Sequence, residues 1–594
     1  MTLRSAGLVV LMVLLGDFAI AESSALAATY KTKIIGVEDS ALAKDLRDSS
    51  QLVALEKEKA DSEEALTRRA EDDLERLRPV TRAAGYYDAE LSYEIDTHAE
   101  PWQVTVKVEL GEPYRLREVR LVAPGGGAPP LLDQFKPEEV GLELGATATS
   151  AAVVGAEAKI VRVYTERGWP LAKMAGREAV IDRADHSMHV TYTIDAGSQA
   201  SFGAIEISGL GAVDHRFVDD QITWHDGEPY DSKKVEAVRQ ALIASNLFST
   251  VKLAPADAVG TDGRVAMRLD VTERPPRSIG VGAYYDTSLG VGARGYWEHR
   301  NLVGAGELLR LEINAGQSIY GGLLRFKKPD LLGNRDLDLL SELSLGQESV
   351  TAYDRRLARV FAGVDYHYTP MITVGAGVEG LQSHVTDDLR TQDYALIGLP
   401  VYAKRDASND LLNPTRGNRE GITLAPYTSV SGPGISFVKG KLTVSGYQQI
   451  GPTDRFVLAA FGNIGSIAGV SLDALPRDQR LYVGGGGSVR GYGYQKAGPL
   501  DIFGKPIGGL SSLETGIELR TRITDTIGIA NFLEGGTVYE KSFPQFDKRL
   551  FWGTGIGVRY YSPLGPVRFD IATPLHRRHE DGLVQIYISL GQAF

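Results

Sequence analysis

Residues 583–594 read LVQIYISLGQAF, and residues 512–523 read SLETGIELRTRI. In the first stretch one side of an extended chain would carry Val584, Ile586, Ile588, Leu590 and Phe594, and the other side Gln585, Tyr587 and Ser589. In the second stretch Leu513, Ile517 and Leu519 alternate with Glu514, Gly516, Glu518, Arg520 and Arg522. This period of two predicts β-strands with one apolar face. Charged residues beside glycine on the other face suit the lumen of a membrane barrel, although alternation alone also fits a soluble sandwich.

Similar stretches, separated by Gly, Asn, Asp and Pro, fill residues 278–594. At roughly 20 residues for a membrane strand and its loop, this part of the chain holds about 16 strands. A closed sheet has no free edges, which lipid could not hydrogen-bond. Glycine makes up 67 of 594 residues, above the usual share of about 7%, and it permits close backbone approach. The sequence therefore predicts a 16-stranded antiparallel transmembrane β-barrel over residues 276–594.

The chain before the barrel repeats one small α+β unit three times. Each copy has a helical stretch followed by two strands, and the closing strands are WQVTVKVELG (102–111), MHVTYTIDAG (188–197) and RVAMRLDVTE (264–273). Corresponding features lie about 80 residues apart, which indicates tandem copies of one unit. We expect the modules at 29–111, 112–197 and 198–275. No polar cluster recurs in all three copies, so no shared ligand site is indicated.

The first 28 residues have the pattern of a secretory signal peptide. Arg4 precedes an apolar run at 6–16, and small-residue sites follow at 19–21 and 25–27. The alternative is an uncleaved anchor, but the run is too short to span a bilayer and Asp17 interrupts it. We therefore expect the mature protein outside the cytoplasm.

The overall composition excludes several classes of protein. Hydrophobic residues form 43% of the chain and charged residues 24%, which rules out a wholly disordered chain. The net charge of −12 argues against a nucleic-acid binder. With no cysteine, there is no disulfide, thiolate zinc site or cysteine nucleophile. A G-x-G-x-x-G match at 290–295 continues as a strand and not as a helix, so it does not indicate a dinucleotide site. No G-x-S-x-G, H-E-x-x-H or Walker motif occurs, and no third ligand accompanies His576 and His579, so we expect no enzyme, cofactor or metal site.

Five short motifs stand out between residues 301 and 575 of the chain. The most specific is GGGGSVRGYGY (484–494), and the others are NLVGAGELL (301–309), RDASNDLLNPTRG (405–417), FLEGGTV (532–538) and YYSPLGPVRFDIATPL (560–575). Together they resemble the motifs of the BamA/TamA outer-membrane assembly superfamily, and the three repeats resemble its POTRA modules. Three repeats favour the TamA branch. The chain departs from the pattern at Asn413 and Glu534, where aspartate is common.

The resemblance implies an outer-membrane location in a Gram-negative bacterium, with the POTRA modules in the periplasm. It also implies an inward loop at 468–508, whose motif consists of Val489, Arg490, Gly491 and Tyr492. Its arginine would pair with acidic residues of the lumen wall, namely Glu518, Glu534 and Asp570. From the residues alone, Arg490 could equally lie exposed in a flexible glycine loop.

For function, the resemblance implies insertion of other outer-membrane proteins, particularly autotransporter-like clients, into the lipid bilayer. The route would be a lateral seam between the first and last barrel strands, with Gly280, Gly282, Ile586, Ile588 and Phe594 as its residues. POTRA edge strands would bind a periplasm-spanning, inner-membrane-anchored TamB-like partner by strand addition. Two alternatives are a two-partner-type secretion pore and a plain diffusion porin.

Overall fold

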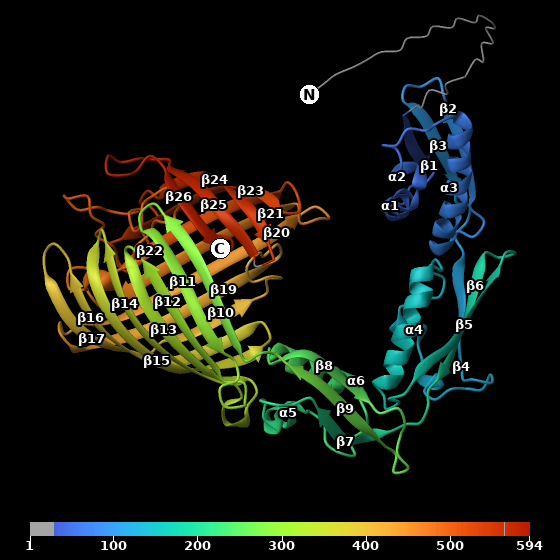
Figure 1. The fold of residues 1–594 in the computed structure, drawn as a ribbon, viewed down its shortest axis with the longest axis horizontal. Coiled ribbons are helices and arrows are strands. Elements are labelled where there is room, and N and C mark those ends of the chain that lie inside the picture. The colour runs from blue at the N-terminus through green and yellow to red at the C-terminus, as the bar shows by residue number, and fades with distance from the viewer. Residues whose placement is uncertain (1–28, 564) are drawn as a thin grey trace, which may run out of the picture. The chain divides into compact units, whose positions relative to one another are not determined.

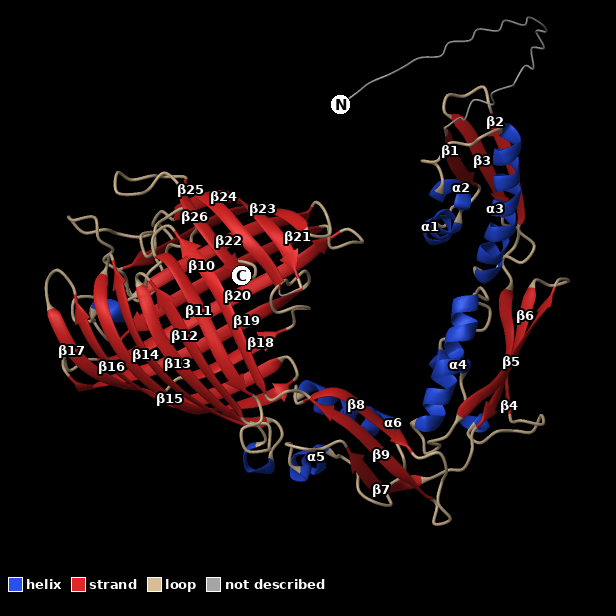
Figure 2. Cartoon of the chain, in the orientation of Figure 1, coloured by secondary structure: helices blue, strands red, loops and turns tan. Residues whose placement is uncertain are grey.

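The computed structural model describes residues 29–563 and 565–594, and the predicted signal peptide lies outside them. The longer helices belong to the N-terminal modules, and strands fill most of the remaining chain (Figures 1 and 2). None of the helices in this described part combines the length and the apolar character that a membrane-spanning helix needs.

Each module contains a three-stranded sheet whose central strand is the last in sequence, in the orders β1-β3-β2, β4-β6-β5 and β7-β9-β8. The first module has β1 (Tyr30–Ile35), α1 (Ser40–Ser49), α2 (Gln51–Ala54), α3 (Glu63–Ala83), β2 (Glu90–Asp96) and β3 (Trp102–Glu109). The second has β4 (Arg115–Val122), η1 (Leu132–Gln134), η2 (Pro137–Val140), α4 (Ser150–Thr165), β5 (Lys173–Asp182) and β6 (Ser187–Asp195). The third has β7 (Ser201–Ser208), α5 (His215–Gln221), α6 (Ser232–Ala244), β8 (Phe248–Pro255) and β9 (Arg264–Glu273). This is the POTRA architecture.

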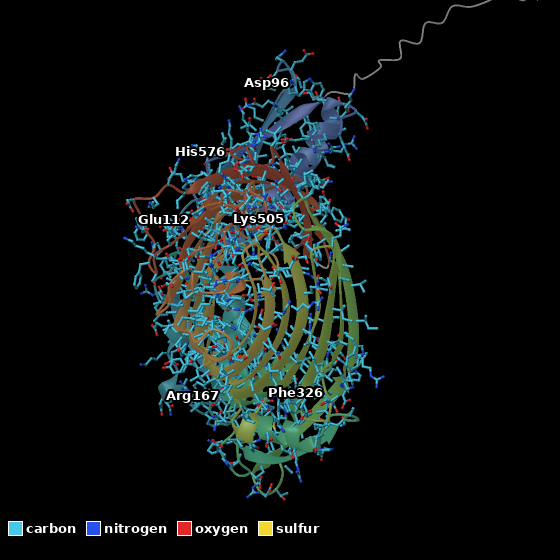
Figure 3. The ribbon with its side chains drawn as sticks, turned by 90° about the vertical axis from the view of Figure 1, so that its left-hand side faces the viewer. Asp96, Glu112, Arg167, Phe326, Lys505 and His576 are labelled. Atoms are coloured by element: carbon cyan, nitrogen blue, oxygen red, sulfur yellow. The ribbon has the colours of Figure 1, made fainter. Side chains whose placement is uncertain are left out.

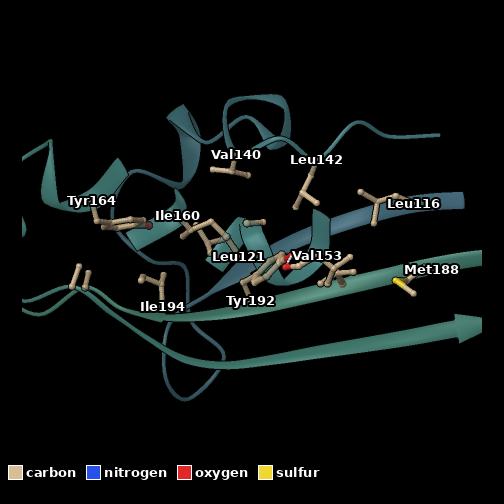
Figure 4. Close-up of a cluster of buried hydrophobic side chains, with 14 of the residues drawn as sticks. Leu116, Leu121, Val140, Leu142, Val153, Ile160, Tyr164, Met188, Tyr192 and Ile194 are labelled. Carbon is tan, nitrogen blue, oxygen red and sulfur yellow. Dashed lines mark hydrogen bonds between the residues drawn. The ribbon is translucent and has the colours of Figure 1, made fainter. Parts of the chain in front are cut away.

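Helix α4 of the second module covers one face of its sheet (Figure 4). Its buried residues Val153, Ile160 and Tyr164 follow helical spacing and form one apolar stripe. Tyr192 of β6 lies beneath this stripe, and its hydroxyl donates a hydrogen bond to the Val153 carbonyl at 2.7 Å. β5 is an edge strand of this sheet, and most of its residues are exposed to solvent.

The barrel consists of β10 (Arg277–Asp286), β11 (Gly290–His299), β12 (Leu308–Gly316), β13 (Ile319–Lys328), β14 (Leu337–Val350), β15 (Tyr353–Thr369), β16 (Ile372–Thr386), β17 (Thr391–Gly398), β18 (Val401–Asp406), β19 (Gly417–Ser431), β20 (Ser436–Ile450), β21 (Phe456–Ala468), β22 (Ser511–Arg522), β23 (Ile527–Tyr539), β24 (Phe551–Ser562), β25 (Gly565–Pro574) and β26 (Gln585–Leu590). Short η3 (Leu331–Gly333) and η4 (Arg477–Gln479) lie in its loops. β17 and β18 both pair with β16 and with β19, so they are two halves of one strand. The described chain therefore closes as 16 antiparallel strands, and the predicted fold class is confirmed.

The two faces of the barrel strands differ in exposure as the alternation predicts. In β22, Glu518 and Arg520 are 0% and 3% exposed, whereas Ile517 is 51% exposed and faces outward. Aromatic rings in the lumen lie over glycines of neighbouring strands: a Cβ on Gly375 would lie 2.3 Å from the Tyr402 ring. Part of the glycine excess therefore provides space for these rings. Phe326 of β13 and Lys505 of a long loop lie toward opposite ends of the barrel (Figure 3).

Parts of the third module pack with the barrel, because residues 206–223 and 236–253 form one compact unit with 268–594. The β11–β12 turn, which contains the NLVGAGE motif, makes the contact. Asn301 Nδ2 donates to the Ala212 carbonyl at 2.9 Å, and the Asp214 N–H donates to the Gly304 carbonyl at 2.8 Å. The third module therefore contacts this end of the barrel, which we call the POTRA end.

The module loop at this contact is held by Glu273 of β9. Its carboxylate accepts hydrogen bonds from the backbone N–H groups of Gly211, Ala212 and Val213 at 2.8–3.0 Å. Burial by itself would raise the pKa of Glu273, but these three N–H groups hold that pKa below its usual range.

Candidate functional site: a buried arginine anchor and a short seam

The loop between β21 and β22, residues 469–510, enters the barrel instead of projecting from it. Val489, Arg490 and Tyr492 are each 0% exposed. The loop backbone lies directly on the inner wall, since a Cβ on Gly491 would lie 2.7 Å from the Thr573 carbonyl oxygen. A Cβ on Gly553 of β24 would lie 1.9 Å from the Arg490 carbonyl oxygen. Only glycine on both sides allows this approach.

Arg490 meets all three acidic residues that the resemblance assigns to it. Its Nη2 lies 2.9 Å from Glu518 Oε2, and its Nη1 lies 2.8 Å from Asp570 Oδ2. Its Nε and its backbone N–H donate to the two oxygens of Glu534 at 2.9 and 2.8 Å. The guanidinium also lies 3.4 Å from the centroid of the Phe532 ring. This fork geometry is specific to arginine, because a lysine ammonium cannot donate in several fixed directions.

Two further arginines, which the sequence did not single out as partners, balance the charge. Arg520 Nε donates to Glu518 Oε1 at 2.8 Å, and Arg559 bonds to both Glu518 and Asp570. All these groups are nearly fully buried. With Arg490 they give three arginines hydrogen-bonded to three carboxylates, and Arg568 Nη1 also lies 3.8 Å from Asp570 Oδ2, so the buried charges are paired. The alternation of β24 would have placed Arg559 in the lumen, but not beside Asp570.

The loop is attached to the barrel wall a second time at its base, by contacts that the sequence does not predict. Asp478 accepts hydrogen bonds from the Ser383 hydroxyl at 2.8 Å and from the Tyr394 hydroxyl at 2.6 Å. These partners belong to β16 and β17, far around the wall from Arg490. Farther along the loop, the Tyr494 hydroxyl donates to Glu348 Oε1 at 3.2 Å. The only sequence cue is a run of polar residues just before the glycines.

The barrel closes between the green β10 and the red β26 in Figure 1, and this seam is short. β10 pairs with β11 from Arg277 to Asp286, but with β26 only at Tyr285–Ile588 and Asp286–Tyr587. One further backbone bond joins the Thr287 N–H to the Ile586 carbonyl at 3.1 Å.

The residues of β10 before the pairing have no β26 partner. The outward side chains Ile279 and Val281 are 76% and 89% exposed. Gly280 faces the lumen, where a Cβ would lie 2.1 Å from the Tyr296 ring, and Gly282 faces open space. The edge of β10 therefore presents unpaired backbone groups at the POTRA end of the seam.

Phe594 does not lie in the seam, in contrast to the sequence-based assignment. β26 ends at Leu590, and Gly591 adopts φ +88°, so the chain leaves the line of the strand. The Phe594 ring then packs in the lumen against Phe461, with 4.5 Å between ring centroids. The alternation fails here because it holds only while the backbone stays extended.

A 16-stranded barrel, an extracellular-side loop fixed in its lumen and a third module that contacts the opposite end define an outer-membrane barrel of the assembly and transport class. Residues 301–594 match the model described as the Omp85 superfamily domain. The chain belongs to this superfamily, which includes BamA and TamA, and its barrel lies in the outer membrane with the POTRA modules in the periplasm.

Two proteins named outer membrane protein assembly factor BamA are similar to the chain. The one from Neisseria meningitidis is 21% identical over 596 residues, which cover 88% of this chain and 72% of the relative. The one from Nitratidesulfovibrio vulgaris is 22% identical over 452 residues, which cover 73% of this chain and 56% of the relative. The match thus spans little more than half of the second relative.

Among solved structures, BamA from Haemophilus ducreyi lacking POTRA domains 1-3 is similar, with a TM-score of 0.65 and 18% identity. The match covers 80% of this chain and 99% of that one. At this identity the likeness concerns the fold alone.

Proposed function

We propose that this chain is a TamA-like factor that inserts other β-barrel proteins into the outer membrane through its seam. The observation that carries the proposal is that β10 and β26 pair at only two positions, whereas β10 and β11 pair over ten residues. A seam with so few backbone hydrogen bonds opens at a much smaller cost in free energy than a fully paired junction such as β10–β11.

The open edge of β10 then serves as a template for a client strand. Backbone groups from Arg277 to Tyr284 have no partner on the seam side, and an incoming strand satisfies them by strand addition. Burial of the client's apolar face in the bilayer drives the insertion, so the process needs no catalysed covalent step and no nucleotide.

The proposed clients are autotransporter-like outer-membrane proteins, and the proposed periplasmic partner is a TamB-like protein. The sheets of the POTRA modules end in edge strands such as β2 and β5. The open side of an edge strand offers a second place for strand addition. These edges support the partner proposal by their geometry.

The alternative function is a two-partner-type secretion pore. The anchored loop argues against an open pore in this conformation. A passenger would have to pass through the lumen, where Arg490 and its three carboxylates hold the loop in place. Transport would require these buried ion pairs to separate, which is costly.

A disulfide across the seam tests the assembly function. The chain has no cysteine, so Tyr285→Cys with Ile588→Cys introduces a single bridge between paired residues. We expect the oxidised variant to lose assembly of an autotransporter-type client in proteoliposomes and to regain it on reduction. The matched control is Phe569→Cys with Ile588→Cys, which joins β25 to β26 and leaves the seam free. Equal client assembly by both oxidised variants would refute the seam as the route.

A further inference from the structure

The barrel wall between β15 and β19 has an apolar depression on its outer surface, with a volume of about 420 Å³. Its lining consists of Val364, Val374, Gly375, Ala376, Val401, Tyr402, Ala403, Ile422 and Leu424. Val374, Ile422 and Leu424 are 45%, 48% and 47% exposed, so these side chains point away from the lumen. Ala403 pairs with Val374 on one side and with Ile422 on the other, and its small side chain leaves space between them. The depression therefore opens toward the lipid, where it is wide enough for an acyl chain.

The depression lies toward the POTRA end of the barrel. Turns between antiparallel strands alternate between the two ends, so the β18–β19 turn (407–416) lies at the same end as the β11–β12 turn that contacts the third module. Val401 and Ala403 of the depression belong to β18, which ends at this turn. On the same outer face of β15, Tyr366 and Tyr368 are 41% and 68% exposed, and such tyrosines mark the head-group level of membrane barrels. The depression therefore faces the periplasmic leaflet, close to the lipid head groups.

An ion pair lies on this outer face between the depression and the β18–β19 turn. Arg405 follows Ala403 by two positions, and Glu420 precedes Ile422 by two, so both charged side chains also point outward. The two residues pair across β18 and β19, and Arg405 Nη1 lies 3.0 Å from Glu420 Oε2. Their side chains are 41% and 32% exposed. The pair therefore lies at head-group level, where a lipid reaches it.

The guanidinium of Arg405 keeps donors for a ligand. Within the described residues only its Nη1 donates, to Glu420 and to Asn418 Oδ1, each at 3.0 Å, while Nε and Nη2 have no protein acceptor. Nε and Nη2 form one edge of the planar group, and this edge matches two oxygens of a phosphate. The Glu420 carboxylate accepts from Arg405 and from Asn418 Nδ2, and it has further lone pairs for a cation. A free donor edge thus lies beside an acceptor of opposite charge.

From this arrangement we propose that the outer wall at Arg405 and Glu420 binds one phospholipid of the periplasmic leaflet whose head group ends in a primary ammonium. The lipid phosphate binds the free edge of Arg405, the ammonium donates to Glu420, and one acyl chain lies in the depression. The acyl chain by itself gives no preference, because the surrounding lipid tails are equally apolar. Selectivity therefore comes from the two charges, and a quaternary ammonium, which has no N–H, is a poorer partner for the carboxylate.

The lipid site is separate from the seam and from the Arg490 anchor. β18 belongs to the eighth and β19 is the ninth of the 16 strands, whereas the seam joins the first and the last. The site thus lies half a barrel away from the proposed route of insertion, and its test does not depend on that route.

Lipid binding to the full-length protein in detergent micelles tests the proposal. Native mass spectrometry counts the lipids bound per protein as dioleoyl phosphatidylethanolamine is titrated, and dioleoyl phosphatidylcholine is the matched lipid with the same chains. For the first bound molecule we expect about threefold tighter binding of phosphatidylethanolamine, the size of effect that a partly exposed ion pair provides. Equal affinity for the two lipids in the wild type overturns the proposal, and this comparison needs no variant.

Two substitutions separate the roles of the charges. Glu420→Gln removes the carboxylate at nearly unchanged size, and it should abolish the preference between the two lipids. Arg405→Gln should weaken the binding of both lipids, because both carry the phosphate. The matched control is Arg356→Gln, since Arg356 is an exposed residue near the other end of β15 on the outer face, and it should bind lipid as the wild type does. A preference that survives Glu420→Gln, or an equal loss in Arg356→Gln, overturns the assignment.

A third substitution tests the place of the acyl chain. Ala403→Phe fills the depression without a change of charge, and it should weaken the binding of both lipids. Ala460→Phe is the matched control, because Ala460 is an exposed alanine of β21 that pairs with the outward-facing Ile517. Equal binding by these two variants overturns the placement of the chain in the depression. The experiment contains no client, so its result is independent of whether the seam is the route of insertion.

Discussion

Replacement of Arg490 by alanine should release the inward loop while the barrel remains folded. The side chain bonds to three buried carboxylates at 2.5–2.9 Å. Without it, Glu518 and Asp570 keep Arg520, Arg559 and Arg568 as partners, whereas Glu534 loses its ion pair and keeps only the backbone N–H of residue 490. Breaking a buried ion pair by removing one partner costs about 3–5 kcal/mol. At 1.4 kcal/mol per factor of ten, the released loop becomes roughly a hundred- to a few-thousand-fold more populated.

Limited trypsin digestion in lipid or detergent measures this release, because Lys496 lies within the loop. We expect rapid cleavage in Arg490→Ala, strongly reduced client assembly and an intact barrel, since the strand ladders do not depend on the loop. The cleavage rate of Arg490→Lys should lie between those of the wild type and Arg490→Ala. Lysine keeps the positive charge but lacks the planar set of donors of a guanidinium. Adding Glu534→Gln to Arg490→Ala should recover part of the loop protection, because it removes a buried carboxylate that has lost its counter-charge. Wild-type protection and assembly in the alanine variant would refute the anchor.

Three further perturbations test other contacts. Asp478→Ala should cost about 1–3 kcal/mol of loop attachment and speed cleavage near the loop base, while the Arg490 contacts persist; unchanged cleavage would contradict a second attachment. Asn301→Ala should speed hydrogen exchange at Ala212 by loosening the third module from the barrel, and exchange at wild-type rate would contradict that contact. Because the pKa of Glu273 is depressed, its stabilisation is full above the unfolded value of about 4.3 and is lost as pH falls through the folded value. The protection factor of the same loop, which corrects for the intrinsic pH dependence of exchange, should therefore fall on acidification in the wild type, and Glu273→Gln should remove that fall; a variant with the wild-type pH profile would refute it.

The faces of the strands follow from the sequence, but the partners across the barrel do not. Alternation places Glu518 and Arg520 in the lumen, because side chains of a strand point to opposite sides in turn. Whether Arg559 meets Asp570 depends on the register of the strands, which alternation does not specify. Asp478 was missed for another reason: a loop has no period, so its path around the wall cannot be read from spacing.

For residues 591–594, which follow β26, the alternation of apolar and polar residues no longer predicts where the side chains lie. Phe594 has the parity of Ile586 and Ile588, and parity alone assigns it to the seam. One left-handed glycine at 591 cancels that assignment, and the contacts with Arg520 and the β18–β19 turn determine where the ring goes. A glycine in a strand pattern signals a break, but not its direction.

The sequence by itself determined the three modules through a repeat of about 80 residues, the strand number through the length of the barrel region, and the inner and outer faces through a period of two in apolar and polar residues. Only the tertiary structure decided which charges meet in the lumen and how little of the seam is paired. Arg490 and Asp570 are 80 positions apart, and the seam joins residues 299 positions apart. Contacts at such separations depend on register and closure of the whole barrel, which no local pattern contains.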